Sequence, residues 1–302
     1  MKKLAVVVLN WNGLADTRAL LPTLLACRMP ADWTLEPIVV DNGSTDGSVP
    51  ALRAEFPVVQ VLELPENRRF AGGNNAGLSR ALANGADAVA LLNNDTQADP
   101  ALFERLLLAL EQDPRAGAAA PLIYYGAPSA RIWYAGAELN VALGVTAHRG
   151  LRQLDHGQYR SVEQTGYLTG CCLLARREVW EKVGPLDESY FIYAEDVDWC
   201  LRARRAGYRL LFVPTARLWH EVSASSGAAS PWKIYQRTRA NLTLFARHAR
   251  GLARLTWLPC YAGLELARMA YLTVQGHGAA AWAVPRAFAD AARGRPAGEV
   301  KA

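Results

Sequence analysis

Short runs of apolar and β-branched residues alternate with helical patterns along the first half of the chain. The runs that we predict to be strands are Leu4–Leu9, Pro37–Val40, Val58–Leu62 and Ala88–Leu92. Leucines recur at helical spacing from Leu14 to Leu25, and a second helical pattern covers Asn74–Asn84. Strands that alternate with helices are typical of βαβ units, because parallel neighbours require a long crossover connection. The alternation predicts an α/β fold with a Rossmann-like, mainly parallel sheet flanked by helices.

Further elements complete this predicted domain. A helix opens at Asp99-Pro100, where a capping residue is followed by proline in the first turn, and it stops before Pro114. Residues 126–166 are irregular and rich in Gly, Tyr and Trp, as expected of an insertion that shapes a second pocket. A helix over Glu195–Ala206 and a strand over Arg209–Val213 close the domain.

Beyond residues 223–227 the pattern becomes helical without strands. We therefore divide the chain into a domain of residues 1–227 and a helical extension of residues 228–302. Within the extension, Leu252–Val274 is rich in Leu, Trp, Tyr and Met but is interrupted by Arg and Glu. This segment is too charged for a membrane span and is suited to lie in a bilayer interface. A helical pair packed on the first domain, or a dimer contact, explains the same pattern, and both interpretations stay open.

The composition is that of an ordinary globular protein. The 302 residues are 51% hydrophobic and 20% charged, which is enough to bury a large core. The net charge of +5 is modest, and no zinc-finger or RNA-binding signature is present, so we expect no nucleic-acid partner. The five cysteines form no CxxC pair, and the first apolar run is too short for a signal peptide. We therefore expect the protein in the cytoplasm.

Polar residues follow three of the predicted strands. The clusters are Asn10-Trp11-Asn12-Gly13, Asp41-Asn42-Gly43-Ser44-Thr45-Asp46-Gly47 and Asn93-Asn94-Asp95. In open α/β sheets the ligand binds outside the carboxyl ends of the strands. The three clusters are therefore expected to converge on one crevice.

Carboxylates in these clusters have a chemical interpretation. Asp41 can accept hydrogen bonds from a base or ribose, although an acid in a turn before the next helix explains it too. The group ending in Asp95 offers oxygen ligands of the kind that Mg²⁺ or Mn²⁺ prefers, although turn chemistry selects the same residue types. His220 follows the last predicted strand and is a candidate further ligand, since imidazole suits Mn²⁺; a structural histidine is the alternative.

A second group of acids, Glu195, Asp196 and Asp198, lies among Tyr, Phe and Trp residues. Burial beside aromatic rings raises the pKa of a carboxylic acid toward the range useful for a general base. Acids at a helix N-terminus would instead complement the helix dipole. The segment alone does not decide between these interpretations.

Five ordered motifs carry a family resemblance. They are Val7-Val8-Leu9-Asn10-Trp11-Asn12-Gly13, Val40-Asp41-Asn42-Gly43-Ser44-Thr45-Asp46-Gly47, Phe70-Ala71-Gly72-Gly73-Asn74-Asn75-Ala76-Gly77, Leu92-Asn93-Asn94-Asp95 and Tyr193-Ala194-Glu195-Asp196-Val197-Asp198. With these motifs the chain resembles family 2 inverting glycosyltransferases of the GT-A fold, and within them the bacterial rhamnosyltransferases. The resemblance runs from about residue 4 to residue 227.

The resemblance implies transfer of a sugar from a nucleoside diphosphate to a hydroxyl group. Asp196 matches the family's base, with Glu195 beside it at the acceptor, whereas Asp198 is assigned to the helix start. Asp95 matches the residue that holds the Mg²⁺ or Mn²⁺ bridging the diphosphate, and we add Asn93 and His220 to that metal site. The positions implied for nucleotide-sugar binding are Asn10, Trp11, Asn12, Asp41, Asn74, Asn94 and Arg69.

Two positions depart from the family pattern. Asn93 stands where many members have Asp, so the motif offers one carboxylate and the cation is expected to bind weakly or to arrive with the nucleotide. Arg69 stands where relatives usually have glycine. Either the backbone that glycine permits is altered there, or the guanidinium reaches the diphosphate.

The same resemblance indicates substrates and location. We expect dTDP-L-rhamnose as donor, a UDP-hexose as the alternative, and a saccharide or lipid-linked saccharide acceptor of cell-surface polysaccharide synthesis. The helical extension is compatible with a peripheral place on the cytoplasmic face of the inner membrane, or with a homodimer. The remaining alternative is a relative that binds nucleotide sugars without turnover; a dehydrogenase would carry GxGxxG after the first strand, which is absent here.

Overall fold

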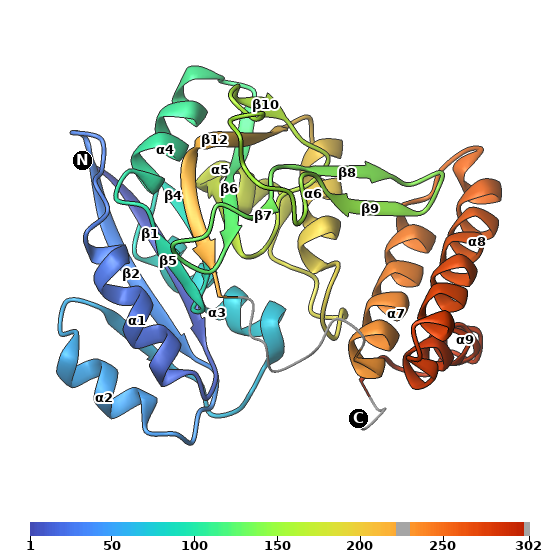
Figure 1. Cartoon of the computed structure of the whole chain (residues 1–302). Coiled ribbons are helices and arrows are strands. Elements are labelled where there is room, and N and C mark those ends of the chain that lie inside the picture. The colour runs from blue at the N-terminus through green and yellow to red at the C-terminus, as the bar shows by residue number, and fades with distance from the viewer. Residues whose placement is uncertain (222–229, 299–302) are drawn as a thin grey trace.

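A computed structural model describes residues 1–221 and 230–298 and contains a large mixed sheet (Figure 1). The strands are β1 (Lys2–Asn10), β2 (Trp33–Asp41), β3 (Gln60–Glu63), β4 (Ala88–Asn93), β5 (Thr96–Ala98), β6 (Ala116–Tyr125), β7 (Ile132–Tyr134), β8 (Ala137–Asn140), β9 (Val145–His148), β10 (Glu163–Gln164), β11 (Cys172–Arg176) and β12 (Arg209–His220). Ten of them form one sheet with the order β10-β12-β6-β11-β4-β1-β2-β3, in which β5 pairs with β12 and β7 with β6. The predicted α/β fold is confirmed.

The direction of the strands divides this sheet into two parts. β3, β2, β1 and β4 are parallel, as βαβ connections require. β11 then runs antiparallel to both β4 and β6, and β12 is parallel to β6. The central residues of β1, such as Val6, Val7 and Val8, are fully buried, which explains why the strand reads as a continuous apolar run.

Helices cover both faces of the sheet (Figure 1). They are α1 (Leu14–Leu25), α2 (Ser48–Glu55), α3 (Arg69–Ala83), α4 (Leu102–Gln112), α5 (Arg177–Val183) and α6 (Glu195–Arg205), followed by α7 (Pro231–His248), α8 (Ala253–Val274) and α9 (Gly278–Ala292). α3 packs directly on β1 and β2. A Cβ atom at Gly77 would clash with Val7, and one at Gly73 would clash with Leu9, so these glycines allow the close approach.

Several boundaries differ from those predicted. α3 begins at Arg69 rather than Asn74; Gly72 and Gly73, which are weak helix formers, lie close to this start and obscure it in the sequence. α4 begins at Leu102, and Asp99 accepts a hydrogen bond from the Ala101 N–H (2.8 Å) in the turn before it. β12 continues well beyond Val213, through a register shift on the β6 side, because the chain resumes pairing with β6 at Arg217.

The insertion at residues 126–166 contains β7, β10 and a separate two-stranded sheet of β8 and β9. The β8–β9 hairpin reaches the C-terminal helices, where the Thr256 hydroxyl donates a hydrogen bond to the Ala142 carbonyl (2.8 Å). The insertion therefore connects the sheet to the helical extension.

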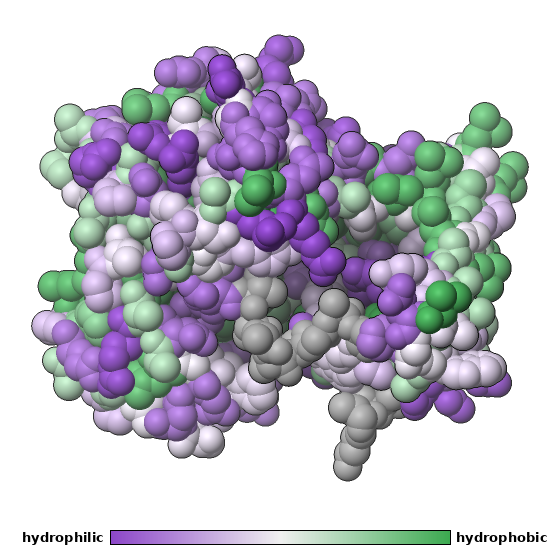
Figure 2. All heavy atoms as spheres, viewed as in Figure 1, coloured by the Kyte–Doolittle hydropathy of each residue, from purple (hydrophilic) through white to green (hydrophobic). Residues whose placement is uncertain are grey.

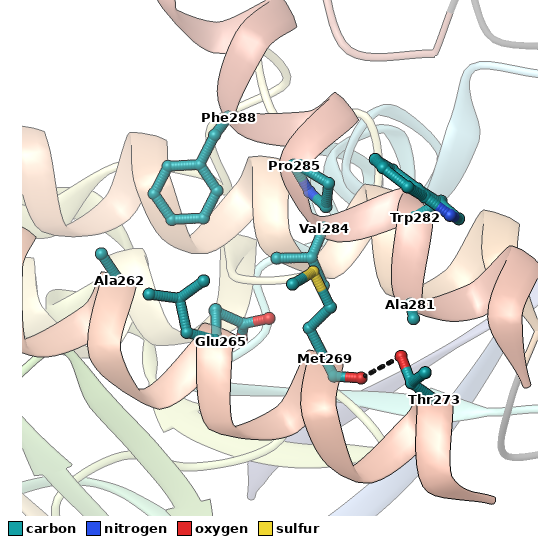
Figure 3. Close-up of a pocket in the computed structure, with 10 residues that line it drawn as sticks. Ala262, Glu265, Met269, Thr273, Ala281, Trp282, Val284, Pro285 and Phe288 are labelled. Carbon is teal, nitrogen blue, oxygen red and sulfur yellow. Dashed lines mark hydrogen bonds between the residues drawn. The ribbon is translucent and has the colours of Figure 1, made fainter.

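The C-terminal helices α7, α8 and α9 pack on one another beside the sheet domain (Figure 1). The predicted domain boundary at residues 227/228 lies outside the described residues. Hydrophobic residues gather over α8 at the right of Figure 2, and α8 and α9 enclose an apolar groove (Figure 3). None of the described helices is both long and apolar enough to cross a bilayer.

Candidate active site

A cavity of about 670 Å³ lies at the carboxyl ends of β4 and β12. Its lining includes four side chains that the sequence singles out: Asn93, Glu195, Asp196 and His220. The cavity therefore brings together residues of the proposed metal group and the proposed catalytic acids, of which Asn93 and Glu195 are about a hundred residues apart in the sequence. This position agrees with the rule that α/β sheets bind ligands beyond the carboxyl ends of their strands.

The proposed metal ligands meet at the edge of this cavity. Asp95 Oδ1 and His220 Nε2 are 3.1 Å apart. Their backbones are joined by the pairing of β5 with β12 and by a hydrogen bond from the Glu221 N–H to the Asp95 carbonyl (2.8 Å). His220 is buried against the ring of Trp133, and its Nδ1 has no hydrogen-bond partner in the described chain.

These donors fit a divalent cation that binds together with phosphate. One carboxylate, one imidazole and the side chain of Asn93 are ligand types that Mn²⁺ accepts. Within the two described ranges, no three His, Cys, Asp or Glu side chains converge as a metal-binding group. A cation held here would therefore need water or phosphate oxygens to complete its coordination.

The proposed nucleotide turn is ordered by its own side chains. Asp41 is 1% exposed, and its two oxygens accept hydrogen bonds from the Asn10 amide (2.8 Å) and the Ser44 N–H (2.9 Å). Asn12 accepts a hydrogen bond from the Thr45 N–H (2.8 Å), whereas the indole of Trp11 is exposed. Asp41 therefore orders the turn before α2, which is the alternative role suggested by its sequence context. Its contact with a nucleotide stays a prediction.

The other proposed nucleotide-sugar residues also have partners within the protein. Asn74 donates to the Phe70 carbonyl (2.9 Å) in its own helix, and Asn94 donates to the Thr17 hydroxyl (3.1 Å). Arg69 has a φ of +63°, in the left-handed region that favours glycine, and its guanidinium lies 4.2 Å from the ring centre of Phe191. Arg69 therefore adopts the backbone conformation that the glycine of the family pattern would permit.

Glu195 and Asp196 form the first turn of α6 and face the cavity. Glu195 is buried and its Oε2 has no hydrogen-bond partner in the described chain; burial and the neighbouring Asp196 raise its pKa to about 8. Asp196 is half-buried and accepts hydrogen bonds from the N–H groups of Gly170 (2.8 Å) and Val197 (2.8 Å). Burial raises the pKa of Asp196, and these N–H groups oppose the rise.

The backbone that leads into these acids is strained. Tyr193 and Ala194 have φ values of +70° and +67°, a conformation that residues other than glycine rarely adopt. Each such residue costs on the order of 1–3 kcal/mol, and such strain clusters at functional sites. The turn aims Glu195 and Asp196 into the cavity, and no sequence signal announces it because neither residue is glycine.

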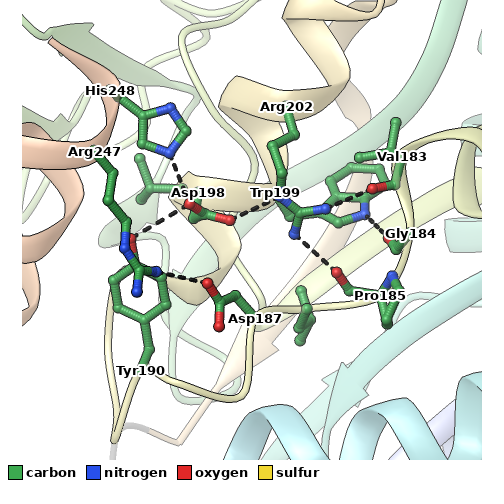
Figure 4. Close-up of polar contacts among 12 residues, drawn as sticks. Val183, Gly184, Pro185, Asp187, Tyr190, Asp198, Trp199, Arg202, Arg247 and His248 are labelled. Carbon is green, nitrogen blue, oxygen red and sulfur yellow. Dashed lines mark hydrogen bonds and ion pairs between the residues drawn. The ribbon is translucent and has the colours of Figure 1, made fainter.

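Asp198 is not part of the cavity lining and connects α6 to α7 (Figure 4). It accepts hydrogen bonds from His248 Nε2 (2.7 Å) and Arg202 Nε (2.8 Å). Burial by itself would raise the pKa of Asp198, but the hydrogen bonds from His248 and Arg202 lower it overall. Asp198 is thus more than a residue of the helix start, and His248, to which the sequence gave no partner, is its main contact.

Sequence patterns missed part of the cavity wall. Arg152 comes from the insertion and Arg237 from α7, and neither side chain forms a hydrogen bond or ion pair with a described residue. His148 also lines the cavity, and burial lowers its pKa to about 4. These residues come from segments without a recognisable motif, so only the fold brings them to Glu195 and Asp196.

Comparison with known proteins agrees with this geometry. The profile of Glycosyl transferase family 2 matches residues 6–184, which is more than half of the chain. The chain belongs to glycosyl transferase family 2. As a glycosyltransferase it is an enzyme, and the residues around the cavity are its candidate active site.

Relatives of this family 2 glycosyltransferase include proteins of polysaccharide synthesis. An N-acetylglucosaminyl-diphospho-decaprenol L-rhamnosyltransferase of Mycobacterium tuberculosis is 32% identical over 63% of this chain and 67% of its own length. The low-salt glycan biosynthesis hexosyltransferase Agl10 of Haloferax volcanii is 25% identical over 67% of this chain and 62% of its own length.

Solved structures share the GT-A fold of this glycosyltransferase. The mannosyltransferase PcManGT of Pyrobaculum calidifontis, in complex with GDP-Man and Mn²⁺, has a TM-score of 0.59 and 20% identity, with coverage of 98% of this chain and 76% of its own. GalNAc-T7 with UDP, GalNAc and Mn²⁺ has a TM-score of 0.61 and 15% identity, with coverage of 81% of this chain but only 47% of its own. Both neighbours contain Mn²⁺.

Proposed function

We propose that this enzyme is an inverting, metal-dependent glycosyltransferase that moves L-rhamnose from dTDP-L-rhamnose to a hydroxyl group of a saccharide or lipid-linked saccharide. The observation that carries the proposal is the shared cavity, which Glu195 and Asp196 line together with His220, whose Nε2 lies 3.1 Å from Asp95 Oδ1. The rhamnose donor is supported by the Mycobacterium tuberculosis relative, whose name states that sugar. A UDP-hexose donor is the alternative.

The chemistry follows from the groups at the two sides of the cavity. The acceptor hydroxyl oxygen forms a bond to the anomeric carbon while the bond from that carbon to the diphosphate oxygen breaks, and the electron pair leaves with the diphosphate. Asp196 takes the hydroxyl proton as general base. Attack and departure on opposite faces invert the anomeric configuration in one step.

Glu195 and the donor side contribute in different ways. Glu195, buried and largely protonated near neutral pH because its pKa is raised to about 8, would donate a hydrogen bond to the acceptor and hold its hydroxyl toward Asp196. Asp95, His220 and Asn93 would hold Mg²⁺ or Mn²⁺. When bound, such a cation stabilises the negative charge that develops on the diphosphate.

Two arginines of the cavity favour an acceptor that carries phosphate. Arg152 and Arg237 line the same cavity as Asp196, and their guanidinium groups form no hydrogen bond or ion pair with the residues that the structure describes. Guanidinium groups bind phosphate strongly, often through two hydrogen bonds. A saccharide linked to a lipid through a diphosphate supplies such groups, and it would place the reaction at the cytoplasmic face of a membrane in cell-surface polysaccharide synthesis.

A panel of nucleotide sugars tests the donor. The midpoint of thermal unfolding should rise most with dTDP-L-rhamnose and Mn²⁺, because a ligand that binds the native state stabilises it. A larger rise with UDP-glucose than with dTDP-L-rhamnose would instead indicate a UDP-hexose as the donor.

The variant Asp196→Asn tests the base. Turnover should fall about a hundredfold while affinity for the nucleotide sugar stays within about twofold, the loss expected when a general base is removed. Unchanged turnover would refute the role of Asp196. A wild-type protein that binds the donor but transfers sugar to no acceptor would favour the alternative that this chain binds nucleotide sugars without catalysis.

A further inference from the structure

The α8–α9 hairpin exposes large apolar side chains to an extent that the sheet domain does not. The exposed large apolar residues of this region are Leu252, Leu255, Leu258, Leu264, Leu266, Tyr271, Val274 and Trp282. Single exposed apolar residues are ordinary on protein surfaces, but a contiguous group marks an interaction site. Figure 2 shows hydrophobic residues gathered over α8.

A groove between the two helices lies within this apolar surface (Figure 3). It has a volume of about 510 Å³, and its walls include Met269 from α8 and Val284 and Phe288 from α9. Trp282 stands at the groove and is 74% exposed. Tryptophan combines an apolar ring system with a polar N–H group, and it is enriched where protein meets the interface of a bilayer.

The exposed charged side chains of the hairpin are all positive. Residues 250–295 contain two acids, Glu265 and Asp290. Both are buried: Glu265 pairs with Arg268 (3.0 Å), and Asp290 accepts hydrogen bonds from Tyr235 (3.0 Å) and Arg295 (3.0 Å). The exposed cations of this segment are Arg250, Arg254, Arg286, Arg293 and Arg295. Arg286, Arg293 and Arg295 lie 3.0–4.0 Å from the single carboxylate of Asp290, so positive charge remains in excess there. The exposed surface is therefore apolar and positive, without exposed acid.

We propose that the α8–α9 hairpin docks on an anionic lipid bilayer. The apolar side chains enter the headgroup region, the helices lie in the plane of the interface, and the arginines contact anionic lipid headgroups. Charge favours this partner over a second copy of the chain, because a twofold contact would bring two arginine-rich surfaces together. Lipid headgroups neutralise the same arginines.

The hairpin is connected to the cavity, so docking would fix the orientation of the active site. α7 lines the cavity through Arg237 and packs on α9, and the β8–β9 hairpin contacts α8 at Thr256. The docking proposal does not rest on the identity of the donor or of the catalytic base. Membrane binding can therefore fail while glycosyl transfer succeeds, and the reverse.

Co-sedimentation of the full-length protein with lipid vesicles tests the proposal. The protein should bind vesicles of phosphatidylcholine with about one third phosphatidylglycerol, and binding should weaken with salt because part of it is electrostatic. The double variant Leu255→Ser/Trp282→Ser should lower vesicle affinity about tenfold or more, since it removes two large apolar contacts. The variant Arg250→Gln/Arg254→Gln should weaken binding to the anionic vesicles alone.

Controls separate docking from folding and from self-association. Val58→Ser changes an exposed apolar residue far from the hairpin in sequence, between α2 and β3, and should leave vesicle binding unchanged. The hairpin variants should keep the wild-type unfolding midpoint. Failure of the wild-type protein to bind anionic vesicles would overturn the proposal. So would a stable dimer in sedimentation velocity that the Leu255→Ser/Trp282→Ser variant dissociates.

Discussion

The contact between Asp198 and His248 allows a quantitative test of how firmly α7 is held against α6. The two side chains are 4–5% exposed, and the distance from His248 Nε2 to Asp198 Oδ1 is 2.7 Å. The variant His248→Ala removes the imidazole and leaves the carboxylate of Asp198 buried. The perturbation acts at a site that does not face the cavity, so its first effect is on stability.

The size of the effect follows from what remains around Asp198. Loss of a hydrogen bond to a buried charged group costs about 1.5–3 kcal/mol. Arg202 still contacts Asp198 at 2.8 Å, so the carboxylate keeps one partner and we expect a loss of about 2 kcal/mol. A protein of this size loses roughly 2 °C in unfolding midpoint per kcal/mol, so the midpoint should fall by about 4 °C.

Thermal unfolding followed by fluorescence measures this change, with urea unfolding as a second method. His277→Ala is the matched control, because His277 is exposed at the start of α9 and its side chain caps nothing; its midpoint should stay within about 1 °C. The double variant Asp198→Ala/His248→Ala should lose less stability than the sum of the two single variants. A midpoint for His248→Ala equal to that of wild type would refute the inference that this contact holds α7 on α6.

Three further predictions concern the cavity. Asp95→Ala should weaken nucleotide binding in the presence of Mn²⁺ and leave the binding measured in EDTA unchanged; an equal loss in both conditions would remove Asp95 from the metal site. Because burial raises the pKa of Glu195 to about 8, its stability contribution is fully present below its unfolded value of about 4.5 and is lost as pH rises through about 8. The unfolding midpoint should therefore fall with rising pH in wild type and fall less in Glu195→Gln; equal slopes would contradict the buried state of Glu195. Arg237→Gln should raise KM about tenfold for an acceptor with a diphosphate while KM for the donor and for a neutral glycoside acceptor stays the same, and a raised donor KM instead would place Arg237 at the donor.

Much of the fold could be predicted from the sequence, because in the parallel half of the sheet the local residue pattern matches the burial of the strands. Strands such as β1 are buried on both faces, so their residues form uninterrupted apolar runs that are visible without a structure. The extension of β12 to His220 was missed because a register shift breaks its pairing with β6 before Arg217. The start of α3 at Arg69 was missed because Gly72 and Gly73 interrupt the helical pattern close to that start.

The candidate site was predictable only where a motif places chemistry at a strand end or a helix start. Asp95, Glu195 and Asp196 belong to such motifs, and the structure brings Asp95 to His220 although 125 positions separate them. Arg237 has no motif, since its position depends on the packing of α7 beside α6. The partnership of Asp198 with His248 likewise depends on tertiary packing, and no helical or strand periodicity encodes it.

The short pairing of β5 with β12 has a consequence for the proposed metal site. Trp219 pairs with Gln97 and His220 with Thr96, so main-chain hydrogen bonds determine the separation of the two segments that carry the proposed ligands, Asp95 and His220. This main-chain pairing does not depend on the side chains at positions 95 and 220. If the site holds a cation as proposed, single substitutions such as Asp95→His or His220→Asp would change its donor atoms, and with them the preference between Mn²⁺ and Mg²⁺, while the pairing of β5 with β12 is retained.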